Sequence, residues 1–161
     1  MSSDWKALFV IIAFFAPIIS IAFPYVTGSI EVNAGQQLKV FEIKYYVDKY
    51  EIYIGNDLYD EGSYPTEEDP SSKIAMALFI MVIAIFAIGS KDYSGIGAFI
   101  YIVLAIYAVY QIYSLPENIA MVIASRLGSG DVISIKSSLS SGSAILGLGA
   151  LAYLAALFSE E

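Results

Sequence analysis

The chain has 161 residues, of which 58% are hydrophobic and 15% are charged, whereas soluble domains carry roughly 45–50% and about 25%. This composition excludes an ordinary soluble globular protein. With 8 Lys and Arg against 16 Asp and Glu, the net charge is −8, so a nucleic acid is not expected as a partner. Because Cys and His are both absent, disulfides, thiol or imidazole catalysis, haem ligation and Cys/His zinc sites are excluded as well.

Four apolar stretches approach the roughly 20 residues that a helix needs to cross a bilayer. They are residues 7–26, 74–89, 95–113 and 139–158, and none of them contains a charged residue. We therefore predict one tetraspan domain over residues 1–161: a membrane all-α four-helix bundle with a small extracytoplasmic antiparallel β-meander. Membrane lipid is then an expected partner. Ionisable residues inside a membrane usually mark ion or proton paths, so their absence argues against a transporter or pump.

Two features inside these stretches allow a functional alternative. Pro17 and Ser20 indicate either a plain helix kink, which is favoured, or a broken-helix binding site. In the third stretch Tyr107, Tyr110 and Tyr113 recur every three residues. Anchoring at the membrane boundary accounts for the last two, and a quinone-binding groove is the alternative.

The segment between the first two stretches, residues 27–73, has the alternating pattern of β-strands. One predicted face carries Phe41, Ile43, Tyr45 and Val47, and the other carries Glu42, Lys44, Tyr46 and Asp48. Asp48 and Lys49 then indicate a tight reversal, after which residues 50–54 alternate again. We predict a short antiparallel meander that is too small to be stable alone and is seated on the helices.

The second loop, residues 114–138, is predicted to hold a short helix and one more strand. The helix covers residues 116–127, with Pro116 near its first turn, and ends at Gly128-Ser129-Gly130. Residues 132–136 look extended, with Ile133 and Ile135 on one face. Because both loops emerge on the same side of the membrane, this strand is expected at the edge of the meander.

The stretch of residues 57–69 is acidic and rich in turns. Its carboxylates lack the D-x-D-x-D-G order of a calcium loop, so a solvated surface or a partner contact is favoured over a metal site. No catalytic residue, cofactor site or metal site is predicted anywhere in the chain.

Two groups of residues are candidates for binding and packing. Exposed tyrosines often anchor protein interfaces, and the candidate partner contacts are Tyr46, Tyr53 and Tyr59 with the neighbouring acids Asp60 and Glu61. Small residues let membrane helices approach closely, and the candidates in the fourth stretch are Gly142, Gly149, Ala152 and Ala156. This smooth helix face packs either inside the bundle, which is favoured, or against another subunit.

Four spans place both termini on one side of the membrane and both loops on the other. The positive-inside rule counts against cytoplasmic termini, because Lys6 and Lys91 on the terminal side face Lys39, Lys73, Arg126 and Lys136 on the loop side. The acidic, Tyr-rich β-loop and the Ser-rich segment favour an exported surface. We predict a multi-pass protein of the cell membrane with cytoplasmic termini and with residues 27–73 and 114–138 outside.

This layout resembles the claudin and peripheral-myelin-protein class of tetraspans over the whole chain, in topology only. That class carries a Trp-Gly-Leu-Trp signature followed by two cysteines in its first loop, whereas here Cys is absent and the single Trp is Trp5. No residue role is carried over. The resemblance implies a similar fold and a similar habit of lateral or face-to-face association. The excess of Ile, Tyr and Ser also looks like that of thermophilic archaeal membrane proteins.

Two functions fit these observations. The first is a non-enzymatic structural or assembly protein of the membrane, whose loops contact other subunits or further copies of itself and whose helix faces pack laterally. The alternative is a cofactor-free accessory subunit of a larger membrane enzyme complex, respiratory or similar. Both explain why catalytic groups are missing from the sequence.

Overall fold

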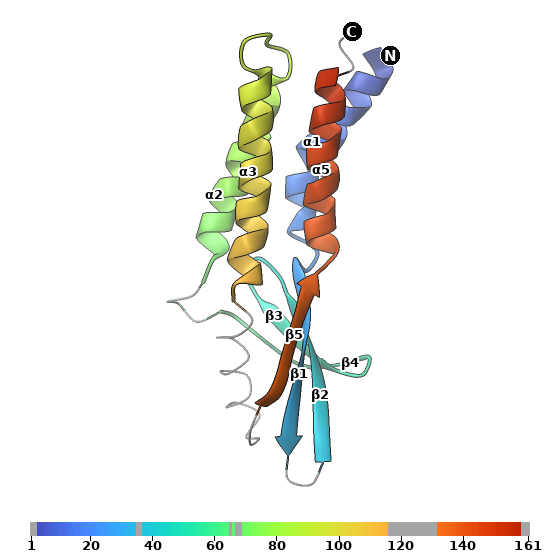
Figure 1. Ribbon diagram of the computed structural model, residues 1–161, viewed down its shortest axis with the longest axis vertical. Helices are drawn as coiled ribbons and strands as arrows, with labels where there is room; N and C mark the ends of the chain where they lie inside the picture. The colour runs from blue at the N-terminus through green and yellow to red at the C-terminus, as the bar shows by residue number, and fades with distance from the viewer. Residues whose placement is uncertain (1–2, 35–36, 65, 67–68, 116–131, 159–161) are drawn as a thin grey trace.

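The helices gather at one end of the molecule and the sheet at the other (Figure 1). The structure, a computed structural model, describes residues 3–34, 37–64, 66, 69–115 and 132–158. Its helices are α1 (Ser3–Ser20), α2 (Ser71–Ala84), α3 (Ser94–Tyr113) and α5 (Ser141–Phe158), and a 3-10 turn, η1 (Ile85–Ala87), follows α2. Its strands are β1 (Val26–Ala34), β2 (Gln37–Tyr45), β3 (Tyr50–Ile54), β4 (Asp57–Gly62) and β5 (Val132–Leu139).

The prediction of an all-α four-helix membrane bundle was wrong. The described part of the chain has a mixed α/β fold, with four α-helices and a five-stranded antiparallel sheet in the order β4-β3-β2-β1-β5. Among the described helices only α3, with 20 residues, and α5, with 18, are long and apolar enough to cross a membrane, judged by length and composition.

The other predicted spans failed because an apolar run continues past the end of a helix. The first run spans residues 7–26, but α1 ends at Ser20 and Val26 already begins β1. The second run tightens into η1, so that α2 itself has 14 residues. The fourth run does contain a helix long enough to cross a membrane, but this helix is shorter than predicted, because Leu139 still belongs to β5 and α5 begins at Ser141. Both helices and strands bury apolar side chains, so hydrophobicity alone does not locate the boundary between them.

The sheet itself follows the sequence prediction closely. The four residues predicted to share the inner face are buried, with exposed fractions of 4% for Phe41, 1% for Ile43, 1% for Tyr45 and 5% for Val47. The reversal after them is closed by the Tyr46 amide, which donates to the Lys49 carbonyl at 2.8 Å.

The predicted edge strand is also present, since β5 pairs antiparallel with β1 and places Ile135 opposite Ile30. This pairing joins the second loop, residues 114–138, to the first loop, residues 27–73. The predicted helix at residues 116–127 and its Gly128-Ser129-Gly130 stop lie outside the described residues.

The helical end is made of two packed pairs, α1 with α5 and α2 with α3. Two buried tyrosines join them. The Tyr101 hydroxyl of α3 donates to the Ala13 carbonyl of α1, and the Tyr153 hydroxyl of α5 donates to the Ala84 carbonyl of α2, each at 2.7 Å. The two rings lie 5.2 Å apart between centroids.

Each of these carbonyls lacks its usual partner inside its own helix. The amide that would bond to Ala13 belongs to residue 17, which is proline and has no N–H. The amide of Ile88 bonds to Ile85 instead of Ala84, because the chain tightens into a 3-10 turn there. A buried, unpaired carbonyl is costly, so Tyr101 satisfies the acceptor that Pro17 leaves open, and Tyr153 adds a bond to a carbonyl that has lost its α-helical partner to the 3-10 turn. Pro17 thus interrupts the backbone hydrogen bonding of α1, and the Tyr101 hydroxyl satisfies the Ala13 carbonyl that is left open.

This arrangement predicts a coupling between Tyr101 and Pro17. Tyr101→Phe leaves the Ala13 carbonyl unpaired and should lower the free energy of unfolding by about 1–3 kcal/mol. In a Pro17→Ala background, the new amide of residue 17 can bond to Ala13, so the same substitution should cost much less. Thermal unfolding of the four proteins in mild detergent measures this cycle. Equal losses in both backgrounds would contradict the repair role of Tyr101.

Candidate partner-binding surface on the sheet

The β3–β4 hairpin projects from the side of the molecule, away from the helices (Figure 1). Its turn, Gly55-Asn56, connects Ile54 to its cross-strand partner Asp57. Gly55 has a φ of 63° and Asn56 does not have a positive φ, which matches a type II′ hairpin turn with Gly at its first central position. The turn residues therefore fix a tight, twisted hairpin.

The tip of this hairpin exposes large apolar side chains. The exposed fractions are 44% for Ile54, 52% for Leu58 and 54% for Tyr59. β4 is also an edge strand of the sheet, and it carries the acidic residues Asp57, Asp60 and Glu61. Charges on an edge strand discourage uncontrolled strand pairing, whereas grouped exposed apolar side chains are typical of interaction sites. The hairpin tip thus has an apolar contact area bordered by acids.

The outer face of β2 and β3 carries an ordered network of aromatic and charged side chains. Glu51 is its centre: it accepts a hydrogen bond from the Tyr53 hydroxyl at 2.9 Å and pairs with the Lys49 ammonium at 3.4 Å. Lys44 lies 4.7 Å from the centroid of the Tyr53 ring, and Lys49 lies 5.3 Å from that of Tyr46. Such cation–π contacts hold the rings in place.

These contacts also set the protonation of the network. Burial acts to raise the pKa of Glu51, but hydrogen bonds from Tyr46 and Tyr53 and the charge of Lys49 outweigh it and hold that pKa below its usual value. Burial and the bond to Glu51 raise the pKa of Tyr46 to about 12. Near neutral pH the network therefore contains an ionised carboxylate and neutral phenols.

The structure brings together only part of the predicted contact set. Tyr46, Tyr53 and Glu61 share the outer face, because Lys49 lies near both Tyr46 and Glu61, with 3.9 Å from its ammonium to the Glu61 carboxylate. A bulge in the β3–β4 pairing shifts the register, and the Tyr59 ring instead packs 5.9 Å from the inner-face ring of Phe41.

Asp60 also departs from the outer-face group. It lies opposite the inner-face residue Ile52, and its carboxylate accepts a hydrogen bond from the Glu61 amide at 2.8 Å. The candidate surface therefore wraps around the hairpin and does not occupy one face.

The predicted packing residues of the last helix point into the molecule. Gly142, Gly149, Ala152 and Ala156 are all buried within this chain. A Cβ atom on Gly142 would lie 2.5 Å from the Tyr25 ring, and one on Gly149 would lie 2.3 Å from the Tyr101 hydroxyl oxygen. These small residues let α5 approach its neighbours.

Sequence reasoning missed Ile54 and Leu58 of the hairpin tip. A signal for the hairpin was present, because the Gly-Asn pair between Ile54 and Asp57 predicts a tight two-residue turn that joins two strands. Alternation alone could not show that β4 has no covering layer.

Within the residues that the structure describes, no group of three or more His, Cys, Asp or Glu side chains is arranged to hold a metal ion. No protein-family model matches the chain, and no curated protein is similar enough to count as a relative. The candidate surface therefore has to be interpreted from its own chemistry.

Proposed function

We propose that this chain is a non-enzymatic membrane protein that recognises a protein partner through its extramembrane β3–β4 hairpin. Its membrane placement is supported by the length and apolar composition of α3 and α5. It is also supported by large apolar side chains exposed on every helix of the described part, among them Phe15 at 47%, Phe79 at 65%, Phe99 at 69% and Leu151 at 65%. Exposed apolar surface on that scale suits lipid.

In this proposal α3 and α5 cross the cell membrane, with α1 and α2 packed beside them. The α2–α3 connection then lies on the cytoplasmic side, and the ends of α3 and α5 that meet the sheet lie outside with it. The orientation is supported by the sequence preference for an exported acidic β-loop, and the α2–α3 connection lies at the end of the molecule opposite the sheet (Figure 1).

The observation that carries the recognition role is the hairpin itself. Leu58 and Tyr59 are more than half exposed, although they extend from a sheet whose inner face is well buried. The adjoining Tyr46 and Tyr53 are held by the Glu51 network, so little side-chain entropy is lost when they meet a partner. The partner is another membrane subunit or a second copy of this chain. From the resemblance to claudins we keep only this habit of association through an extramembrane sheet.

Substitution of the hairpin tip should weaken assembly without unfolding the protein. The test variant is Leu58→Thr combined with Tyr59→Ser. The matched control is Val40→Thr, because Val40 is similarly exposed, at 47%, but lies on β2 and outside the hairpin. We expect native mass spectrometry of membrane extracts to show loss of a larger particle in the hairpin variant and its retention in the control.

The composition of that particle separates the two kinds of assembly. Several copies of this chain alone indicate a self-assembling structural protein, whereas cofactor-bearing companions indicate an accessory subunit. An unchanged particle in the hairpin variant, with thermal unfolding also unchanged, would contradict the proposed recognition surface.

A further inference from the structure

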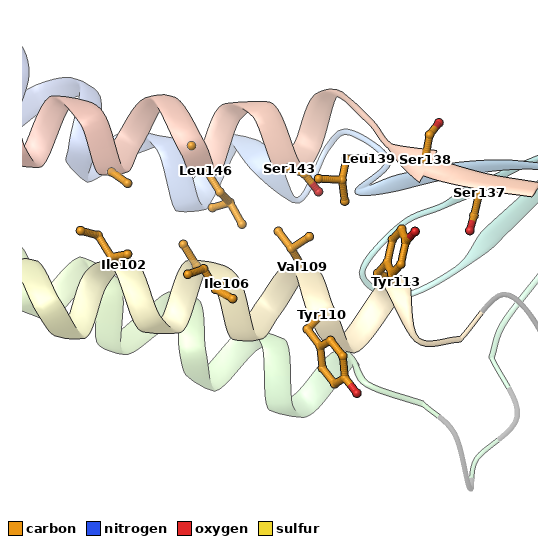
Figure 2. Close-up of a pocket in the computed structure, with 13 residues that line it drawn as sticks. Ile102, Ile106, Val109, Tyr110, Tyr113, Ser137, Ser138, Leu139, Ser143 and Leu146 are labelled. Carbon is orange, nitrogen blue, oxygen red and sulfur yellow. The ribbon is translucent and has the colours of Figure 1, made fainter.

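The helices α3 and α5 enclose a laterally open groove on the side where β5 leads into α5 (Figure 2). The two helices touch at Tyr101 and Tyr153, and the groove lies between this contact and the sheet. The space between them has a volume of about 710 Å³, which lies within the range of roughly 300–1,000 Å³ that is typical of small-molecule sites. It is therefore large enough for a substantial part of a lipid.

The groove is apolar along most of its length. Ile102, Ile106 and Val109 of α3 line one side, and Leu146, Gly147 and Ala150 of α5 line the other. Figure 2 shows Val109 and Leu146 directed toward each other across the space. Water is a poor occupant of an apolar cavity because it needs several polar partners. A hydrocarbon chain needs no polar partners, so it is a better occupant of this groove than water.

One end of the groove is polar. Tyr113 at the end of α3, Ser137 on β5 and Ser143 on α5 place hydroxyl groups there, next to the sheet (Figure 2). The Ser143 hydroxyl already donates to the Tyr25 carbonyl at 2.7 Å, which leaves its oxygen as an acceptor. Among the described residues that line the groove none is charged, so the site offers hydrogen bonds but no counter-ion for a phosphate.

We propose that this groove binds a neutral amphiphilic lipid, with its hydrocarbon chain between α3 and α5 and its hydrogen-bonding head at Tyr113, Ser137 and Ser143. The inference rests on the membrane placement proposed above, since the bilayer supplies the ligand and the polar end then lies at the level of the lipid headgroups. A lipid with a neutral head fits this site better than the bulk phospholipid does, because the charged phosphate of a phospholipid would meet no charged side chain among the described lining residues.

The test uses the full chain in phosphatidylcholine nanodiscs that contain a trace of a photoreactive probe. Two probes with identical acyl chains are compared, a diazirine-bearing diacylglycerol and the corresponding phosphatidic acid. After irradiation, mass spectrometry maps the adducts. We expect several-fold more labelling of groove residues by the diacylglycerol than by the phosphatidic acid. Equal labelling by the two probes would overturn the neutral-head assignment.

Gly147→Trp should fill the groove, because a Cβ atom at Gly147 meets nothing within 4 Å. Leu148→Trp is the matched control: Leu148 is 60% exposed on the next position of the same helix and does not line the groove. Groove labelling should fall several-fold in Gly147→Trp and persist in Leu148→Trp. Equal labelling of the wild type and Gly147→Trp would overturn the groove as the binding site.

A milder variant keeps the test independent of folding. Tyr113→Phe with Ser137→Ala removes two hydroxyls and little volume, and it should abolish the preference for diacylglycerol while adducts on the lipid-facing residue Leu151 remain. Preservation of the preference would overturn the head site. If the helices do not lie in a membrane, adducts will be missing from Leu151 as well as from the groove. This result differs from that of a failed head site, in which the adducts on Leu151 remain.

Discussion

Ile43→Asp is expected to unfold the sheet, with a loss of more than about 3 kcal/mol in the free energy of unfolding, because it places a charge without a partner in an apolar interior. The Ile43 side chain is 1% exposed and lies opposite Ile52 in β3 and Gly28 in β1. A Cβ atom at Gly28 would already lie 2.6 Å from the Lys136 carbonyl oxygen, so β1 and β5 lie close together beside Ile43.

The measurement is limited proteolysis of the sheet, with thermal unfolding in mild detergent beside it. Lys44→Gln is the control, because the neighbouring side chain lies on the outer face. A carboxylate at position 44 would be a poorer control, since residue 44 lies opposite Glu51 and would add like-charge repulsion. Equal protease resistance of Ile43→Asp and Lys44→Gln would contradict the observed register.

Gly149→Ala is expected to destabilise the helical end by about 1–3 kcal/mol, the usual cost of overpacking. The added Cβ would lie 2.3 Å from the Tyr101 hydroxyl oxygen and 2.6 Å from the Ala16 Cβ. Neither neighbour can retreat cheaply, because the hydroxyl is bonded to the Ala13 carbonyl and the Ala16 Cβ is fixed to the α1 backbone. The substitution therefore either separates α1 from α5 or breaks the Tyr101 bond.

Gly147→Ala is the matched control for this prediction. It lies one half-turn away on the same helix and has open space around its Cβ position. Because Ala favours a helix over Gly by about 1 kcal/mol, it should leave thermal stability unchanged or slightly raised. If both variants melt alike in mild detergent, the close contact of α1, α3 and α5 at Gly149 is not present in solution.

The sheet was predictable because its signals are local. Alternation places Phe41, Ile43 and Tyr45 on one face whatever lies beyond them, and two neighbouring strands then fix the register. An edge strand at residues 132–136, far along the chain from the meander, was still predicted, because four apolar stretches put both loops on one side; the structure then pairs it with β1. The wrong span count did not affect that inference.

The helices and the binding surface were less predictable for a physical reason. Hydropathy reports where apolar residues occur and not which structure buries them, so the end of α1 at Ser20 and the 3-10 turn after Ala84 were missed. The roles of Tyr101 and Tyr153 depend on carbonyls freed on other helices, which a single sequence does not reveal. The candidate contacts Tyr46 and Tyr53 both bond to Glu51 on the outer face, whereas the β4 bulge separates Tyr59 from them.

Single cysteines test the proposed placement of the sheet outside the membrane most directly, and the chain has no native cysteine to interfere. Ser63 follows β4 at the sheet end, and Ser90 lies in the α2–α3 connection at the opposite end. In intact cells an impermeant maleimide should label Ser63→Cys and should label Ser90→Cys only after the membrane is permeabilised. Labelling of Ser90→Cys in intact cells, with Ser63→Cys protected, would contradict an external recognition surface.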